Sequence, residues 1–237
     1  MVIVQHYPHS AKHYAEASPS PGGLFPIPDA CPACGAVNHL IRWGFYERWA
    51  CTIFTDYRVR VQRVRCKACG RTHSLLPDFL HPYRHYVISL LQCIVSLYLL
   101  ANVSIAGLME HLLGQGPVRS TVREWISAFA YGAGMLLVDW LRRQLATFSP
   151  LSELPETPPP DHLERVPDAT KQRRLAKAHR FWCLAEQIYA QAKTRLPQLH
   201  FATEQVLAFV LHWLQNQAVT PRIFWSPRLT TTPTEPF

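Results

Sequence analysis

The chain has 237 residues, enough for two small domains, and its hydrophobic content of 48% permits a packed core. Its formal net charge of +8 favours phosphate, an anionic membrane or an acidic partner without choosing among them. Residues 87–101 are apolar but too few to span a membrane, and residues 1–20 lack the order of a secretion signal, so we expect a cytoplasmic protein.

Two CxxCG motifs, at residues 31–35 and 66–70, follow a proline-rich leader over residues 1–30 that we expect to be flexible and without regular structure. Each CxxC turn places two sulfurs on one side, and the glycine after it can take a positive φ. Four sulfurs complete a tetrahedral zinc site with no open position, so His73 nearby is not needed as a ligand. We therefore predict one structural Zn²⁺ ion bound by Cys31, Cys34, Cys66 and Cys69.

Alternating apolar and polar residues predict two antiparallel strands between these motifs. Apolar side chains fall mainly on odd positions in residues 39–51, and a second strand has Arg58 and Arg60 on one face and apolar residues on the other. The alternation shifts after Gln62, so we expect a β-bulge there. Residues 31–80 should then form a zinc ribbon. Three of its aromatic residues are more typical of a small core than of base-stacking platforms, namely Trp43, Tyr46 and Trp49.

Basic residues are concentrated in the ribbon, where arginine and lysine far outnumber Glu47 and Asp56. Some of this positive charge must offset the four thiolates. The rest either forms a solvated face that protects an edge strand or contacts phosphate, for which arginine offers a bidentate fork. On the second interpretation, the DNA-contacting residues of the ribbon are Arg42, Arg48, Arg58, Arg60 and Arg63.

A helix-turn-helix bundle is predicted over residues 81–149. We expect a central apolar helix over residues 83–101, a second helix capped by Ser104, and a break at the glycines of residues 114–117. Two helices joined by a glycine-bearing turn are typical of a helix-turn-helix, although an ordinary three-helix bundle shows the same pattern.

The third helix of this bundle is the candidate recognition helix. Thr121 and Glu124 form a capping-box pattern at its start. Its expected buried face consists of Val122, Trp125, Ile126 and Phe129. Hydroxyls and arginines around its first turns suit contacts with phosphates and base edges. These predicted DNA-contacting residues are Arg119, Ser120, Thr121, Arg123 and Ser127.

The remaining chain is predicted to be a proline-rich linker over residues 150–168, a helical hairpin over residues 169–217 and a disordered tail over residues 218–237. The first hairpin helix has an apolar stripe over residues 175–196, which could dock a partner or a second copy of the chain. The expected fold is therefore mostly α, with a small N-terminal β zinc ribbon, a helix-turn-helix bundle and a C-terminal helical hairpin.

The two CxxCG motifs, residues 44–48 and residues 64–73 resemble the N-terminal zinc ribbon of bacterial insertion-sequence transposases. The continuation over residues 74–84 resembles an uncharacterised bacterial family of transposase-like zinc-ribbon proteins. The resemblance covers residues 31–129. It implies recognition of transposon-end DNA, with Cys31, Cys34, Cys66 and Cys69 as the zinc ligands. The acidic catalytic core that normally follows in transposases has no counterpart here.

These observations predict a non-enzymatic protein of the bacterial cytoplasm that binds double-stranded DNA and is associated with a mobile genetic element. Its role would be transposon-end recognition or an accessory or regulatory one, with a transposase or a second copy as partner. One alternative is a protein-docking subunit of a larger nucleoprotein assembly. Another is an enzyme with a trimmed or split catalytic core.

Overall fold

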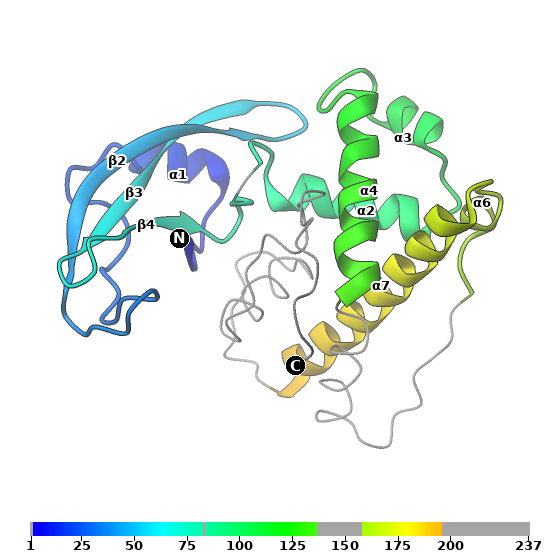
Figure 1. Cartoon of the computed structure of the whole chain (residues 1–237). Coiled ribbons are helices and arrows are strands. Elements are labelled where there is room, and N and C mark those ends of the chain that lie inside the picture. Colours follow the sequence, from blue (N-terminus) through cyan, green and yellow to red (C-terminus); the bar gives the residue numbers. More distant parts are fainter. Residues whose placement is uncertain (1, 83, 137–157, 196–237) are drawn as a thin grey trace. The chain divides into compact units, whose positions relative to one another are not determined.

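The computed structural model of the chain describes residues 2–82, 84–136 and 158–195 (Figure 1). The described residues fall into two compact units, one ending at Ser89 and the other beginning at Leu90. Within this described part of the chain, no helix has the length and apolar character that a membrane span requires.

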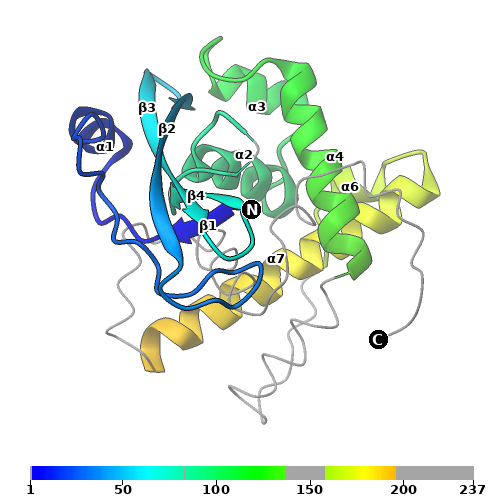
Figure 2. The same cartoon turned by 60° about the vertical axis from the view of Figure 1, so that its left-hand side comes forward.

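The first unit is built on a four-stranded sheet with the order β1-β4-β3-β2 (Figure 1 and Figure 2). Its strands are β1 (Val2–Gln5), β2 (Leu40–Cys51), β3 (Asp56–Cys66) and β4 (Thr72–Pro77). β3 pairs antiparallel with β2 and with β4, whereas β1 pairs parallel with β4. The two predicted ribbon strands are therefore present as β2 and β3, inside a larger sheet than the sequence indicated.

The leader is ordered, and the prediction of a flexible segment without regular structure was wrong. It contributes β1 and the helix α1 (Ala11–Ala17), whose N-cap Ser10 accepts a hydrogen bond from the His13 amide at 3.3 Å. Tyr14 of α1 is buried, and its ring lies 4.9 Å from that of Tyr7 and 6.0 Å from that of Phe25. The prolines therefore separate short elements, and the aromatic residues between them attach the leader to the sheet.

The β-bulge lies at the predicted position along the ladder, but its extra residue is on β2. The pairing shifts between Arg42 and Gly44, which lie opposite Val64 and Arg63, directly after Gln62. Gly44 has a φ of 104°, a conformation that glycine takes without steric cost. The prediction is therefore corrected only in the strand that carries the irregularity.

Trp43 and Trp49 are 49% and 45% exposed, so the expectation that these rings form the ribbon core was wrong. The register explains the difference for Trp49, because paired residues share a face of the sheet. It places Trp49 opposite Arg58, while the fully buried Val59 lies opposite Arg48. The inward face of β2 at this end is therefore the one that holds Arg48.

The described part of the second unit is helical. Its helices are α2 (Ile88–Leu100), α3 (Ile105–His111), α4 (Arg119–Leu136), α6 (Asp161–Glu164) and α7 (Ala169–Arg195). Together with the sheet of the first unit, they match the predicted mixture of helices and a small sheet. The sheet, however, takes a larger share of the fold than "mostly α" implied.

Two helices begin at different residues than predicted. α2 begins at Ile88 rather than near residue 83, because Tyr86 and Val87 form β-bridges with Cys51 and Leu80. α4 already begins at Arg119, so Thr121 lies inside the helix and is not its N-cap. The cap predicted for α3 is present, since Ser104 Oγ accepts from the Gly107 amide at 3.2 Å. The connection between α3 and α4 is longer than a typical helix-turn-helix turn.

α7 packs against α4 in the same unit, where the sequence predicted a separate hairpin (Figure 1). The Phe129 ring of α4 lies 5.6 Å from the rings of both Phe181 and Trp182 of α7, and all three side chains are buried. Asp168 begins α7 by accepting hydrogen bonds from the amides of residues 170 and 171. The linker is also not wholly extended, because it contains α6. The second hairpin helix and the predicted tail lie outside the described residues, as do residues 137–157.

Candidate metal centre and nucleic-acid interface

The four predicted ligands come together in one cluster. Their sulfur atoms all lie within 4.8 Å of one another. The Cys31 and Cys69 sulfurs are 3.8 Å apart, as are those of Cys34 and Cys66. A tetrahedral zinc ion with Zn–S bonds of about 2.3 Å requires sulfur–sulfur distances of about 3.8 Å. The cluster is therefore compatible with one four-sulfur zinc ion, which would crosslink the start of the ribbon to the β3–β4 turn.

The two CxxCG turns have the same local geometry. The Gly35 amide donates to the Cys31 carbonyl at 2.8 Å, and the Gly70 amide donates to the Cys66 carbonyl at 2.9 Å. Both glycines have positive φ values, 73° and 70°, as the sequence predicted. Residues with a Cβ atom rarely adopt this conformation, so each glycine allows its turn to close behind the pair of sulfurs.

His73 on β4 lies beside the cluster without completing it. Its Nε2 atom is 3.4 Å from the Cys31 sulfur, and its side chain is almost fully buried. Desolvation lowers the pKa of His73, so the ring is neutral at physiological pH and can donate Nε2–H to the sulfur. Histidines and backbone groups in such positions orient metal-bound thiolates.

Without a cation, the thiols of Cys31 and Cys34 compete for ionisation. Burial opposes ionisation of Cys31, but hydrogen bonds from the backbone of residues 33 and 34 and from neighbouring thiols lower its pKa to about 7. The pKa of Cys34 is raised to about 12, because its hydrogen bond with the backbone at residue 36 is outweighed by burial and by its thiol neighbours. A divalent cation would remove this competition by compensating the thiolate charges.

Three of the five ribbon arginines attach parts of the first unit to one another, since the Arg60 Nη1 group also donates to the Pro19 carbonyl of the leader at 3.2 Å. The Arg48 Nη2 group donates to the carbonyl of His81 at 3.0 Å and to that of Arg84, and burial lowers the pKa of Arg48. The Arg42 Nη1 group donates to the Gly22 carbonyl in the leader. Arg48 therefore has a structural role, which corrects its assignment as a DNA contact.

Exposure divides the five arginines differently, because Arg42 and Arg58 are exposed whereas Arg48, Arg60 and Arg63 are half-buried. Arg58 is 65% exposed and pairs with Glu47 at 2.6 Å. Its guanidinium lies 5.9 Å from the centre of the Trp49 ring. Arg60 stacks over Phe45 at 4.6 Å, and Arg63 is partly exposed. Alternation along β3 places Arg58 and Arg60 on one face and Arg63 on the other.

The polar residues predicted for the recognition helix lie on the outside of α4. Its predicted inward face is confirmed, since Val122, Trp125, Ile126 and Phe129 are all buried. Most of the predicted contact residues are exposed and one is partly exposed. The exposed ones are Arg119, Ser120, Arg123 and Ser127, and the partly exposed one is Thr121.

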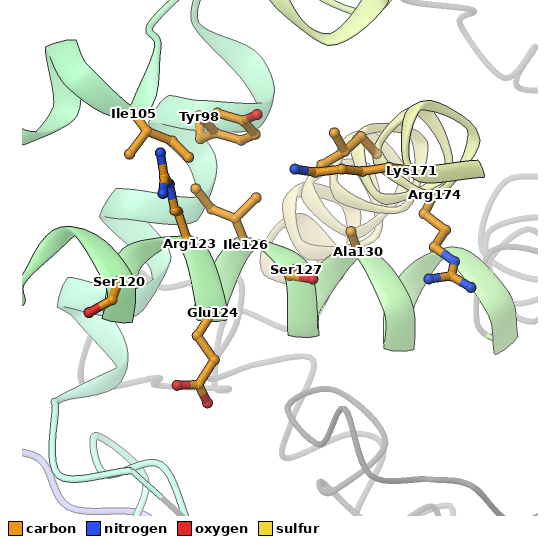
Figure 3. Close-up of a pocket in the computed structure, with 11 residues that line it drawn as sticks. Tyr98, Ile105, Ser120, Arg123, Glu124, Ile126, Ser127, Ala130, Lys171 and Arg174 are labelled. Atoms are coloured by element: carbon orange, nitrogen blue, oxygen red, sulfur yellow. The ribbon is translucent and has the colours of Figure 1, made fainter. Parts of the chain in front are cut away.

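A cavity of about 390 Å³ in the second unit lies between α4 and α7 (Figure 3). Its polar lining comes from Ser120, Arg123, Glu124 and Ser127 of α4 and from Lys171 and Arg174 of α7. The sequence analysis missed the two α7 residues. A basic run at the start of α7 was visible in the sequence, but its position beside α4 depends on long-range packing.

Comparison with known proteins gives one match. Residues 31–108 match a family model described as a domain of unknown function, DUF6431. This segment includes all four cluster cysteines and ends within α3, before the candidate recognition helix. Neither the curated proteins nor the solved structures contain a match. The comparisons name no activity, so the transposase resemblance stays a prediction.

Proposed function

We propose that this protein is a non-enzymatic, zinc-containing protein that binds double-stranded DNA through α4 and the zinc ribbon. The observation that carries the proposal is the outward polar face of α4, where Arg119, Ser120, Arg123 and Ser127 are exposed while the opposite face is buried. A major groove admits one α-helix, arginine reads guanine edges, and hydroxyls contact phosphates.

The position of α4 in the chain supports a role as the reading helix. It follows the short helix α3 after a connection in which Leu113, Gly114 and Gly116 all have positive φ values. Its 18 residues correspond to a length of about 27 Å, so its first turns can enter a groove while later turns pack against α7.

The ribbon would supply contacts that do not depend on sequence. Arg58, Arg60 and Arg63 are at least partly exposed on β3, and their guanidinium groups suit phosphate oxygens. The proposed zinc ion would hold the end of β3 at Cys66, which reduces the freedom of the strand that displays them. We infer that these arginines contribute affinity and that α4 contributes sequence discrimination.

A salt titration with full-length, zinc-loaded protein tests this proposal. Binding sites are first selected from a random duplex pool, and affinity is then measured by fluorescence anisotropy at several salt concentrations. The logarithm of affinity should fall linearly with the logarithm of salt concentration, with a slope of about −0.9 for each phosphate contacted. No enrichment together with a slope near zero would falsify the proposal.

The Arg123→Ala variant tests the role of α4. The preference for the selected duplex over a scrambled duplex should fall by about 1–3 kcal/mol. Arg165→Ala is the matched control, because Arg165 is 80% exposed, lies at the end of α6 and is not part of the α4 surface. If the two variants discriminate equally between the selected and the scrambled duplex, α4 does not read the DNA sequence.

The association with a mobile element, as a protein that recognises transposon ends or regulates a transposase, is a narrower proposal. Its support is the ribbon resemblance over residues 31–129. Enrichment of element-end sequences in the selection would favour it, and enrichment of unrelated sequences would separate DNA binding from transposition.

Exposed aromatic residues on the ribbon favour a second candidate function, a protein-docking subunit of a nucleoprotein assembly. Trp43 and Trp49 are about half exposed, and Phe54 in the β2–β3 turn is 84% exposed. The α7 stripe that suggested docking is instead used against α4, at least up to Ala185. A full-length variant with Trp49→Ser and Phe54→Ser should keep its duplex affinity if these rings face a protein.

A further inference from the structure

We propose that the cavity between α4 and α7 is a phosphate-binding site formed by Arg123 together with Lys171. This inference deepens the proposed function and rests on it for one of two ligand sources. The phosphate could belong to the DNA backbone beside α4 or to a small phosphorylated molecule. Both sources present the same oxyanion to the same two cations.

The shape of the cavity fits a ligand group. Its volume of about 390 Å³ lies within the range of about 300–1,000 Å³ that is usual for ligand pockets. Figure 3 shows the Lys171 side chain extending from α7 toward α4, where Arg123 rises beside Ile105, while Arg174 is directed away from both. An oxyanion between Arg123 and Lys171 would contact a planar guanidinium on one side and an ammonium group on the other.

The charge around the cavity is unbalanced. Its lining holds three basic side chains and one acidic side chain, Glu124, which points away from Arg123 and Lys171 in Figure 3. Within the described part of the chain, neither Arg123 nor Lys171 forms an ion pair. The nearby Asp168 accepts the backbone amides that begin α7. These hydrogen bonds and the charges of Arg174 and Lys171 lower the pKa of its carboxyl, which therefore offsets only part of the positive charge at the cavity. An anion would therefore reduce repulsion among cations that the fold holds close together.

Packing fixes the helices that carry these cations. Leu175 and Ala178, one and two turns after Lys171, are buried where α7 meets α4. Arg123 lies between Val122 and Glu124 on a helix whose inward face is packed. Tyr98 and Ile105 supply an apolar wall, which lowers the local polarity and strengthens charge-assisted hydrogen bonds to an oxyanion. The side chains of Arg123 and Lys171 are exposed, so they can adjust to a ligand on a fixed backbone.

The test uses full-length, zinc-loaded protein and two probes. Inorganic pyrophosphate is titrated calorimetrically at low salt, and a duplex selected as above is titrated by anisotropy across salt concentrations. The variants are Lys171→Gln and Arg123→Gln. Lys177→Gln is the matched control, because Lys177 is an exposed lysine of the same helix outside the cavity. Circular dichroism and zinc content confirm that each variant is folded.

If the ligand is a small phosphorylated molecule, wild-type protein should bind pyrophosphate. Lys171→Gln and Arg123→Gln should then weaken this binding about tenfold or more, while Lys177→Gln should not. If the ligand is a phosphate of the DNA backbone, Lys171→Gln should lower the affinity for the duplex. It should also reduce the slope of log affinity against log salt concentration by about one, and Lys177→Gln should do neither. Either result supports the site.

If Lys171→Gln and Lys177→Gln behave alike with both probes, the phosphate site is overturned, while DNA binding through α4 is unaffected. If the wild-type chain binds no duplex but loses pyrophosphate binding in Lys171→Gln, the proposed DNA function fails and the cavity stands as a site for a small phosphorylated ligand.

Discussion

Arg48 and Arg58 show how the face of a strand decides what a charged side chain does. Arg48 lies opposite the fully buried Val59, and its guanidinium donates to two carbonyls near the end of the first unit. Arg58 lies opposite Trp49 on the other face and pairs with Glu47 near solvent. Buried guanidinium groups with carbonyl partners stabilise a fold, whereas exposed ion pairs contribute little.

Arg48→Ala should therefore lower the free energy of unfolding by about 2–3 kcal/mol, because it removes hydrogen bonds from two carbonyls and the packing of the side-chain stem. Arg58→Ala should change it by no more than about 0.5 kcal/mol. Urea unfolding of zinc-loaded protein, followed by circular dichroism, measures both. Equal losses in the two variants would contradict the different roles of the two faces.

At the level of elements, α7 shows that an apolar stripe does not identify what covers it. Leu175, Ala178 and Trp182 follow helical spacing, and the sequence analysis reserved this stripe for a hairpin or a partner. In the structure they are buried in the contact with α4, where Phe181 and Trp182 lie against Phe129. The helix nevertheless begins close to its predicted start. Asp168 accepts an amide of its first turn, and the apolar stripe has helical spacing, so both signals depend only on residues nearby in the chain.

Trp182→Ala should lower the free energy of unfolding by about 3–5 kcal/mol, the usual cost of removing a large buried ring. Lys177→Ala, an exposed change on the same helix, should alter it by less than about 0.5 kcal/mol. Thermal and urea unfolding at several protein concentrations measure both effects. If α7 packs on α4 of its own chain, the midpoints should not depend on concentration, and a strong dependence would indicate a contact between two chains.

For the whole molecule, the cysteine cluster belongs to the first unit alone, since all four sulfurs precede Ser89. The second unit has its own buried core, formed around Trp125, Phe129 and Trp182. Metal binding to a four-sulfur site contributes directly to the folding of the elements that carry it. Loss of the metal should consequently affect the two units differently.

The purified protein should contain one zinc ion per chain. Removing it with a strong chelator should abolish hydrogen-exchange protection in residues 31–77 while α4 and α7 keep theirs. Cys34→Ser should lower the zinc content, and Cys93→Ser, which changes an exposed cysteine outside the cluster, should not. Elemental analysis and hydrogen exchange read by mass spectrometry give both results. Full protection of the ribbon in zinc-free protein would exclude a structural role for the metal.

The leader and the ribbon aromatics mark where local sequence patterns stopped being informative. The prediction for the leader was based on its proline content and did not consider three aromatic residues. These residues, Tyr7, Tyr14 and Phe25, form the buried cluster of the leader. Trp43 and Trp49 were assigned inward by hydrophobicity, but strand register decides the face and their rings are partly exposed. Hydrophobicity alone cannot choose between the two faces of a strand when one carries rings and the other a buried arginine.

The sequence by itself determined the four cysteine ligands, the two glycine-closed turns, the paired strands between them and the inward face of α4. These features depend on neighbours a few residues away, so spacing and local conformational preference are enough to predict them. Only the tertiary structure decided that β1 joins the sheet, that Arg48 donates to two backbone carbonyls, that α7 covers α4, and that Lys171 and Arg123 line the same cavity. Each of these depends on a contact between residues tens of positions apart, which chain packing selects and local pattern does not encode.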